Sequence, residues 1–148
     1  MQITGRCHCG DVSFELAWRP EPIEIAARAC GCSFCTKHGA AWTACASGSL
    51  VVRAERARVT PYELGTKTAR FHVCAACGVV AVVTSVIYGR LYAVVNVNTF
   101  EGDAGALVRR APVHLDDEST SDRLARRARS WIADVTFPGA VDAPAPSV

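Results

Sequence analysis

The stretch Cys30-Gly31-Cys32-Ser33-Phe34-Cys35 decides how this sequence is interpreted, because it places three thiols within six residues. Three sulfur ligands this close together can bind one metal ion, but they leave a tetrahedral ion one ligand short. Two further groups of cysteines stand elsewhere in the chain, Cys7 with Cys9 and Cys74 with Cys77. The spacing of these thiols predicts a protein organised around metal sites.

The composition narrows the class of protein. A chain of 148 residues can bury a core without disulfides, so its eight cysteines need another explanation. No signal segment is recognised ahead of Cys7, and we therefore expect a reducing compartment, the cytoplasm, where clustered cysteines are more often metal ligands than disulfides. The longest apolar run, residues 79–87, is shorter than the ~20 residues that span a membrane. A net charge of +2 argues against a nucleic-acid binder.

Short segments of alternating apolar and polar residues, separated by turns, extend to about Leu115. This pattern is typical of an antiparallel all-β domain, to which we assign residues 1–118. Pro61 suits a strand at a sheet edge, because proline cannot donate a backbone hydrogen bond. Residues 79–87 and 91–100 are expected to pair as a buried hairpin. The other expected strands are 12–16, 23–29, 40–46, 50–52, 59–64 and 69–73.

The C-terminal part has a different pattern. We expect residues 119–137 to form an amphipathic helix, capped by Ser119 or Ser121, that packs on the β domain. Its expected apolar stripe, anchored in the core by Trp131, comprises Leu124, Ala128, Trp131 and Ile132. The arginines at positions 123, 126, 127 and 129 are expected on a solvated face. Residues 138–148, which are rich in proline and small residues, are expected to form a disordered tail.

The simplest partition of the thiols gives one complete and one incomplete metal site. The complete site is structural, and its four ligands are Cys7, Cys9, Cys74 and Cys77. A glycine follows each of its two cysteine pairs and tolerates the positive φ that such turns require. The incomplete site has the ligands Cys30, Cys32 and Cys35. Its fourth ligand is water, a substrate or His38, which follows Cys35 at a spacing that metal sites use.

Other uses of the thiols stay open at this point. Disulfides, a Cys-x-x-Cys redox relay and free thiols at the incomplete site are the alternatives, although a Cys-x-Cys disulfide closes a strained ring. Zinc is favoured as the ion, because sulfur-rich tetrahedral sites select zinc or iron–sulfur clusters and the split into four and three is unlike common cluster spacings. Cys45 lies in an apolar segment and is expected to be an inert buried thiol, with a ligand role as the alternative.

The cysteine groups and their flanking residues together form an ordered set of motifs. The set comprises Gly5-Arg6-Cys7-His8-Cys9-Gly10, the triple-cysteine stretch with Gly39, Arg70-Phe71-His72-Val73-Cys74-Ala75-Ala76-Cys77-Gly78, and Val95-Asn96-Val97-Asn98-Thr99-Phe100. In this order the sequence resembles the family of glutathione-dependent formaldehyde-activating enzymes, which shares its domain with centromere protein V. The resemblance implies an antiparallel β-tent fold and two zinc ions. The structural zinc would be held by Cys7, Cys9, Cys74 and Cys77, and the zinc associated with activity by Cys30, Cys32 and Cys35.

The resemblance also implies a reaction, the addition of the glutathione thiol to formaldehyde to give S-hydroxymethylglutathione. We therefore expect a zinc-dependent carbon–sulfur lyase acting on glutathione, or another small thiol, and formaldehyde or a related carbonyl. After the third cysteine the family pattern has two basic residues, whereas this sequence has Lys37 and His38, which we assign to substrate binding. His8, His72 and His114 are expected to be structural or unliganded.

Two other functions compete with this hypothesis. The first is a non-catalytic zinc module that contacts a protein or nucleic-acid partner through its arginine-rich helix, and the second is a thiol-based sensor of oxidants or metals. A fourth ligand from His38 or Cys45 would favour the module. The sequence is compatible with a homo-oligomer and leaves the true substrate open.

Overall fold

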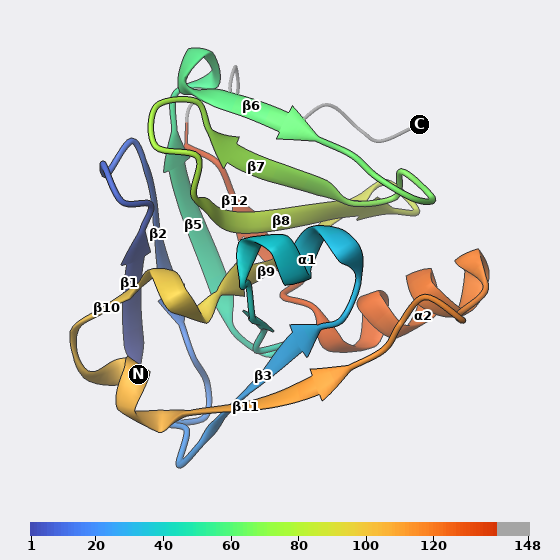
Figure 1. Cartoon of the computed structure of the whole chain (residues 1–148). Coiled ribbons are helices and arrows are strands. Elements are labelled where there is room, and N and C mark those ends of the chain that lie inside the picture. The colour runs from blue at the N-terminus through green and yellow to red at the C-terminus, as the bar shows by residue number, and fades with distance from the viewer. Residues whose placement is uncertain (139–148) are drawn as a thin grey trace.

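A computed structural model describes residues 1–138, which form two β-sheets and two short α-helices (Figure 1). Nearly all of the tail predicted for residues 138–148 lies outside the described residues. Neither of the two α-helices in the described part is long and apolar enough to span a membrane.

The first sheet has five strands in the order β10-β1-β2-β5-β12. They are β1 (Gln2–Arg6), β2 (Val12–Ala17), β5 (Ser49–Ala54), β10 (Phe100–Glu101) and β12 (Asp134–Thr136). The second sheet has seven strands in the order β11-β3-β4-β9-β8-β7-β6. They are β3 (Ile25–Cys30), β4 (Trp42–Thr43), β6 (Val59–Tyr62), β7 (Arg70–Cys74), β8 (Val80–Ile87), β9 (Arg90–Asn96) and β11 (Val108–Val113). The α-helices are α1 (Ser33–His38) and α2 (Thr120–Ser130), and single 3-10 turns cover Arg56–Arg58, Val97–Thr99 and Gly102–Leu107.

The predicted all-β class is confirmed, with one difference in strand direction. Most neighbouring strands are antiparallel, but β3 pairs with β11 and β5 pairs with β12 in parallel. A parallel pair needs a long connection between its strands, and in each of these pairs several other elements intervene in the chain. The strand β6, which contains Pro61, lies at the edge of its sheet as predicted.

The predicted buried hairpin is confirmed as β8 and β9, and both of its faces are covered. Val82 pairs with Val95, and both side chains belong to the core between the two sheets. Their neighbours Val83 and Val94 point the other way, into a second core that contains Trp42, Phe71 and Trp131. Since successive side chains alternate between the faces of a strand, burial of both faces explains the apolar run of residues 80–83 at the start of β8.

Two predicted elements are much shorter in the structure. The strand expected over residues 40–46 is limited to the two residues of β4. The helix expected over residues 119–137 ends at Ser130, because Trp131 adopts an extended conformation and Ile132 forms a β-bridge with Ala93. The following residues add β12 to the edge of the first sheet, which the sequence pattern did not predict.

The orientation predicted for α2 is wrong. Its one buried residue is Arg127, whereas Ala128 of the expected apolar stripe is exposed and Leu124 is half-buried. Arg123 and Arg126 are also largely covered, and among the helical arginines Arg129 alone is exposed. The prediction of Trp131 as a core anchor is confirmed, since this side chain is buried in the second core.

A close approach between β1 and β2 gives a first test of the packing. A Cβ atom on Gly5 would lie 2.2 Å from Cζ of the buried Phe14, which is paired with it in the sheet. We expect Gly5→Ala to destabilise the fold by about 1–3 kcal/mol through overpacking, measured as a lower Tm. The same substitution at Gly105, where the added Cβ meets nothing within 4 Å, is the control. Equal Tm values for the two variants would contradict this packing.

Candidate metal centres and active-site cavity

The predicted complete site is brought together from two distant parts of the chain. Cys7 and Cys9 lie in the turn between β1 and β2, while Cys74 and Cys77 lie at the end of β7 and in the turn before β8. All four sulfur atoms lie within 4.8 Å of one another. The Sγ atoms of Cys7 and Cys9 are 3.7 Å apart, and those of Cys9 and Cys74 are 3.5 Å apart. Tetrahedral zinc with Zn–S bonds of ~2.3 Å requires about 3.8 Å, so the donor set fits such an ion.

Both turns have the backbone geometry of metal-binding knuckles. Gly10 and Gly78 each have positive φ, 88° and 80°, as the sequence predicted. The backbone N–H of Val12 donates a hydrogen bond to Cys7 Sγ at 3.3 Å. Such N–H groups stabilise sulfur in its negatively charged form. This cluster could therefore hold a metal ion with no position left for a substrate.

The second cluster, formed by Cys30, Cys32 and Cys35, lies where β3 meets α1. Cys30 ends β3, and Cys32 and Cys35 belong to the start of α1. Cys32 is the N-cap of α1 and its Sγ accepts a hydrogen bond from the backbone N–H of Cys35 at 3.4 Å. The helix ends at Gly39, whose φ of 65° forms a left-handed C-cap.

Cys30 and Cys35 have pKa values shifted in opposite directions. A hydrogen bond from the Cys35 thiol lowers the pKa of Cys30 to about 5. The same interaction, together with burial, raises the pKa of Cys35. The indole N–H of the buried Trp42 donates to Cys35 Sγ at 3.3 Å and fixes its position. The cluster thus accommodates negative charge on sulfur and fits a thiophilic cation.

No fourth ligand completes this cluster among residues 1–138, since no His, Asp, Glu or further Cys has a ligand atom close enough to join it. Its three sulfurs instead line a cavity of about 150 Å³. Trp42, Phe71, Val83 and Val94 supply apolar wall, and the loop 64–69 covers part of the rim. The open side of the three-thiol cluster is therefore accessible to a small molecule.

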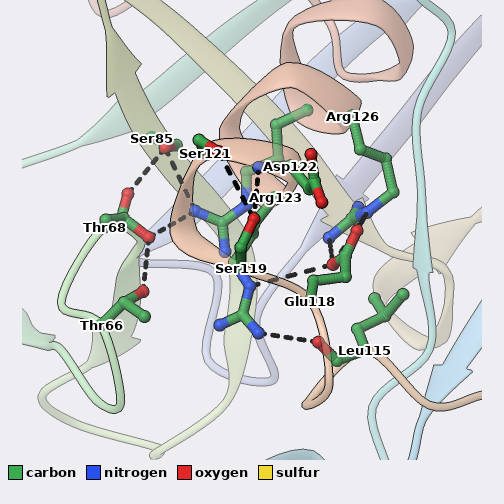
Figure 2. A network of polar contacts seen from close by, with 11 residues as sticks. Thr66, Thr68, Ser85, Leu115, Glu118, Ser119, Ser121, Asp122, Arg123 and Arg126 are labelled. Atoms are coloured by element: carbon green, nitrogen blue, oxygen red, sulfur yellow. Dashed lines mark hydrogen bonds and ion pairs between the residues drawn. The ribbon is translucent and has the colours of Figure 1, made fainter.

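Four arginines line the same cavity: Arg28, Arg123, Arg126 and Arg127. Arg28 stands two residues before Cys30 on β3, so alternation along the strand puts both side chains on the same face, a signal present in the sequence but not used above. The other three come from α2, which lies beside the ends of β3 and β11 in Figure 1. Arg126 forms a bidentate pair with Glu118, with contacts of 2.9 Å (Figure 2), and this hydrogen bond lowers the pKa of the Glu118 carboxyl. This ion pair offsets part of the free-energy cost of turning the Arg126 guanidinium away from solvent.

The remaining candidate residues lie outside the cavity wall. Lys37 and His38 are exposed on the last turn of α1, where the His38 ring contacts the Phe34 ring at 4.5 Å between centroids. Neither lines the cavity, and their role in substrate binding stays a prediction. Cys45 is buried, donates to the Arg19 carbonyl oxygen at 3.2 Å and belongs to neither cluster.

The other histidines have surroundings that do not suggest catalysis. His72 is buried and bonded to Thr84 Oγ1 at 2.7 Å, and burial followed by the charge of Arg70 lowers its pKa to about 4. It is therefore neutral near pH 7. His114 is exposed and its ring packs against Gly31, where a Cβ would lie 2.8 Å from the ring. His8 is exposed between two cysteines of the first cluster and is not part of it.

The protein is a mostly β domain with two potential cysteine metal sites. One is a four-thiol cluster, and the other is a three-thiol cluster that lines a cavity. The sequence matches the model of the glutathione-dependent formaldehyde-activating enzyme family over residues 2–113. The chain belongs to this family, which connects it with the chemistry of glutathione and formaldehyde.

A crystal structure of a Rhodobacter sphaeroides protein is similar to this chain. The two share 32% sequence identity with a TM-score of 0.54, over 68% of this chain and 89% of the other. The search of curated proteins found no match. The family match ends at residue 113, so α2 lies beyond it.

Proposed function

We propose that this protein is a zinc-dependent enzyme of the carbon–sulfur lyase type, which forms or cleaves the adduct between a small thiol, such as glutathione, and formaldehyde or a related carbonyl. The observation that carries the proposal is the three-thiol cluster that lacks a fourth protein ligand within the described residues and faces a cavity. Family membership supports the same chemistry. The free state of all eight cysteines supports a reducing compartment such as the cytoplasm.

The thiol clusters, the arginines and the apolar wall would contribute differently to this reaction. Cys30, Cys32 and Cys35 would hold the catalytic zinc, and the four-thiol cluster would hold a structural zinc. A bound zinc would supply Lewis acidity, which lowers the pKa of a thiol and polarises a carbonyl oxygen. The arginines of the wall favour a negatively charged thiolate, and the apolar residues opposite them exclude water.

The reaction needs no further reagent. The thiolate sulfur attacks the carbonyl carbon, a C–S bond forms, and the π electrons of the carbonyl move to its oxygen. The proton released by the thiol ends on that oxygen, which gives the S-hydroxymethyl product. In the reverse direction the hydroxyl loses its proton and the C–S bond breaks.

Replacement of Cys32 by serine tests the proposal. We expect the metal content of the purified protein to fall from two zinc ions per chain to one, in line with the two clusters, while the far-UV circular dichroism is retained. The rate of adduct formation from formaldehyde and glutathione or 2-mercaptoethanol, followed by NMR exchange, should fall to the uncatalysed rate. The control is Cys45→Ser, which changes a buried thiol outside both clusters and should keep both zinc ions and the activity. Equal activity of wild type and Cys32→Ser with both thiols would refute the proposal.

A further inference from the structure

Three buried donors on residues that line the cavity have no hydrogen-bond partner. Among the buried side-chain nitrogen and oxygen atoms of residues 1–138, those without a hydrogen bond are Nε of Arg123, Nε of Arg127 and Nε1 of Trp131. All three residues come from α2 or its C-cap, and all three line the same cavity. Each atom is an N–H donor and none is an acceptor. Buried polar groups in folded proteins are almost always hydrogen-bonded, so these unpaired donors make the α2 side of the cavity unusually rich in N–H groups and positive charge, which complements an anionic ligand.

Arg127 is the most buried of these cations, with 8% of its surface exposed. Its Nη1 donates to Thr68 Oγ1 at 2.8 Å and lies 3.4 Å from Ser85 Oγ, two residues that Figure 2 shows on one side of the network. Its guanidinium also lies 4.9 Å from the centre of the Trp131 ring. These neighbours orient the group, but all of them are neutral. Glu118 acts on this charge only from a distance, and a buried charge without a direct ion pair is costly, so an anionic ligand would stabilise this site.

The other two arginines that α2 contributes to the cavity are already compensated. Arg126 has its bidentate pair with Glu118, and Arg123 donates to the Leu115 carbonyl oxygen at 2.7 Å and lies 3.8 Å from the same carboxylate (Figure 2). Burial, followed by the charges of Arg126 and Arg123, lowers the pKa of Arg127 to about 10, so Arg127 remains protonated at neutral pH. Arg127 is thus the buried arginine of α2 without a carboxylate in direct ion-pair contact within the described residues.

The size of the cavity limits the ligand. Its volume of about 150 Å³ is below the range of roughly 300–1,000 Å³ that is usual for pockets that enclose drug-sized ligands. A tripeptide such as glutathione would extend beyond it. A thiol with only a few carbon atoms between its sulfur and an anionic group matches this volume, and Trp42 and Phe71 offer apolar wall for its carbons.

We propose that the cavity selects a small thiol that carries a carboxylate, a mercapto-acid, with Arg127 binding the carboxylate while the sulfur lies at the three-thiol cluster. This inference rests on the proposed function and narrows its thiol substrate; the bond changes of the reaction are the same. The residues that would set this preference belong to α2, outside the part of the chain that matches the family model.

The test is isothermal titration of the zinc-loaded full chain with 3-mercaptopropionate and with its uncharged amide. A charge-assisted hydrogen bond to a buried guanidinium is expected to favour the acid by about tenfold or more in Kd. In Arg127→Met this preference should fall to within about twofold, whereas Arg129→Met, which removes the exposed arginine of the same helix, should keep it. Propionate, which has no sulfur, should compete with the acid in the wild type but not in Arg127→Met.

Several outcomes would overturn the inference. Equal binding of acid and amide by the wild type would refute it even if Arg127→Met fails to fold, and would leave the proposed function standing. A tenfold preference for glutathione would refute the limit on size, and a similar preference for 2-mercaptoethanesulfonate would refute the choice of carboxylate. Absence of binding and turnover for every thiol would refute the proposed function itself.

Discussion

Replacing Cys74 with serine is expected to abolish the cooperative fold. Cys74 is almost fully buried and connects β7 to the four-thiol cluster, which joins the β1–β2 turn to the β7–β8 turn. Structural zinc contributes about 10–16 kcal/mol of binding free energy in small zinc domains, as much as or more than the ~5–15 kcal/mol that stabilises an entire domain. Circular dichroism should show loss of β structure at 25 °C, and metal analysis should show loss of the structural ion.

The matched control for this prediction is Cys45→Ser. Cys45 is also buried, but its sulfur contacts only the Arg19 carbonyl oxygen and Ser47 Oγ, partners that a serine hydroxyl can also satisfy. The Tm of this variant should stay within a few degrees of the wild type, at a cost of about 1 kcal/mol or less. Cooperative melting of Cys74→Ser near the wild-type Tm would show that the four-thiol cluster does not hold the fold together.

Truncation of Ile132 is expected to have the second largest effect. This side chain has 0% of its surface exposed, lies in the core between the sheets, and its backbone exchanges hydrogen bonds of 3.0 Å with Ala93. Ile132→Ala should cost about 2–5 kcal/mol because it leaves a cavity in a close-packed core. The loss should appear as a lower midpoint in urea denaturation with an unchanged slope.

The control is the same isoleucine-to-alanine substitution at an exposed position. Ile23 is 95% exposed, and Ile23→Ala should change the free energy of unfolding by less than about 0.5 kcal/mol. If both variants had the same midpoint, residues 131–137 would be a dispensable extension. The expected difference would show that they belong to the same cooperative unit as the β-sheets.

Local spacing was enough to predict the metal clusters. The partition into four and three thiols follows from short sequence separations and from glycines that allow the turns, and the structure brings together the same two groups. The β8–β9 hairpin was equally predictable, because a run of β-branched residues interrupted by Tyr88-Gly89 has few other solutions. In both cases the deciding information lies within a few neighbouring residues.

The face that α2 presents to the domain could not be predicted in this way. Helical periodicity separates an apolar side from an arginine side, but the choice of the inward side depends on groups elsewhere in the chain. Glu118 compensates Arg126, and Thr68 and Ser85 accept hydrogen bonds from Arg127. The strand β12 was missed because it has only three residues and is defined by its pairing with β5.

The inward arginines also bear on the competing hypothesis of an interaction module. That hypothesis needs a basic helix surface exposed to a partner, and of the four helical arginines only Arg129 is exposed. Those at positions 123, 126 and 127 line the cavity instead. The structure therefore favours a small ligand over a macromolecular partner for this helix.

The parallel pairing of β3 with β11 separates the chain segment that covers the cavity from the segments that carry the cysteines. Val113 lies beside Cys30, so the chain leaves the sheet at the same end at which the three thiols gather. Residues 114–131 then return over the cavity without contributing any of the clustered thiols. Substitutions or insertions in this segment would change the lining of the cavity while the clustered cysteines, encoded far upstream, stay untouched. The wall of the cavity and the thiol clusters can therefore be inherited and altered separately within one small domain.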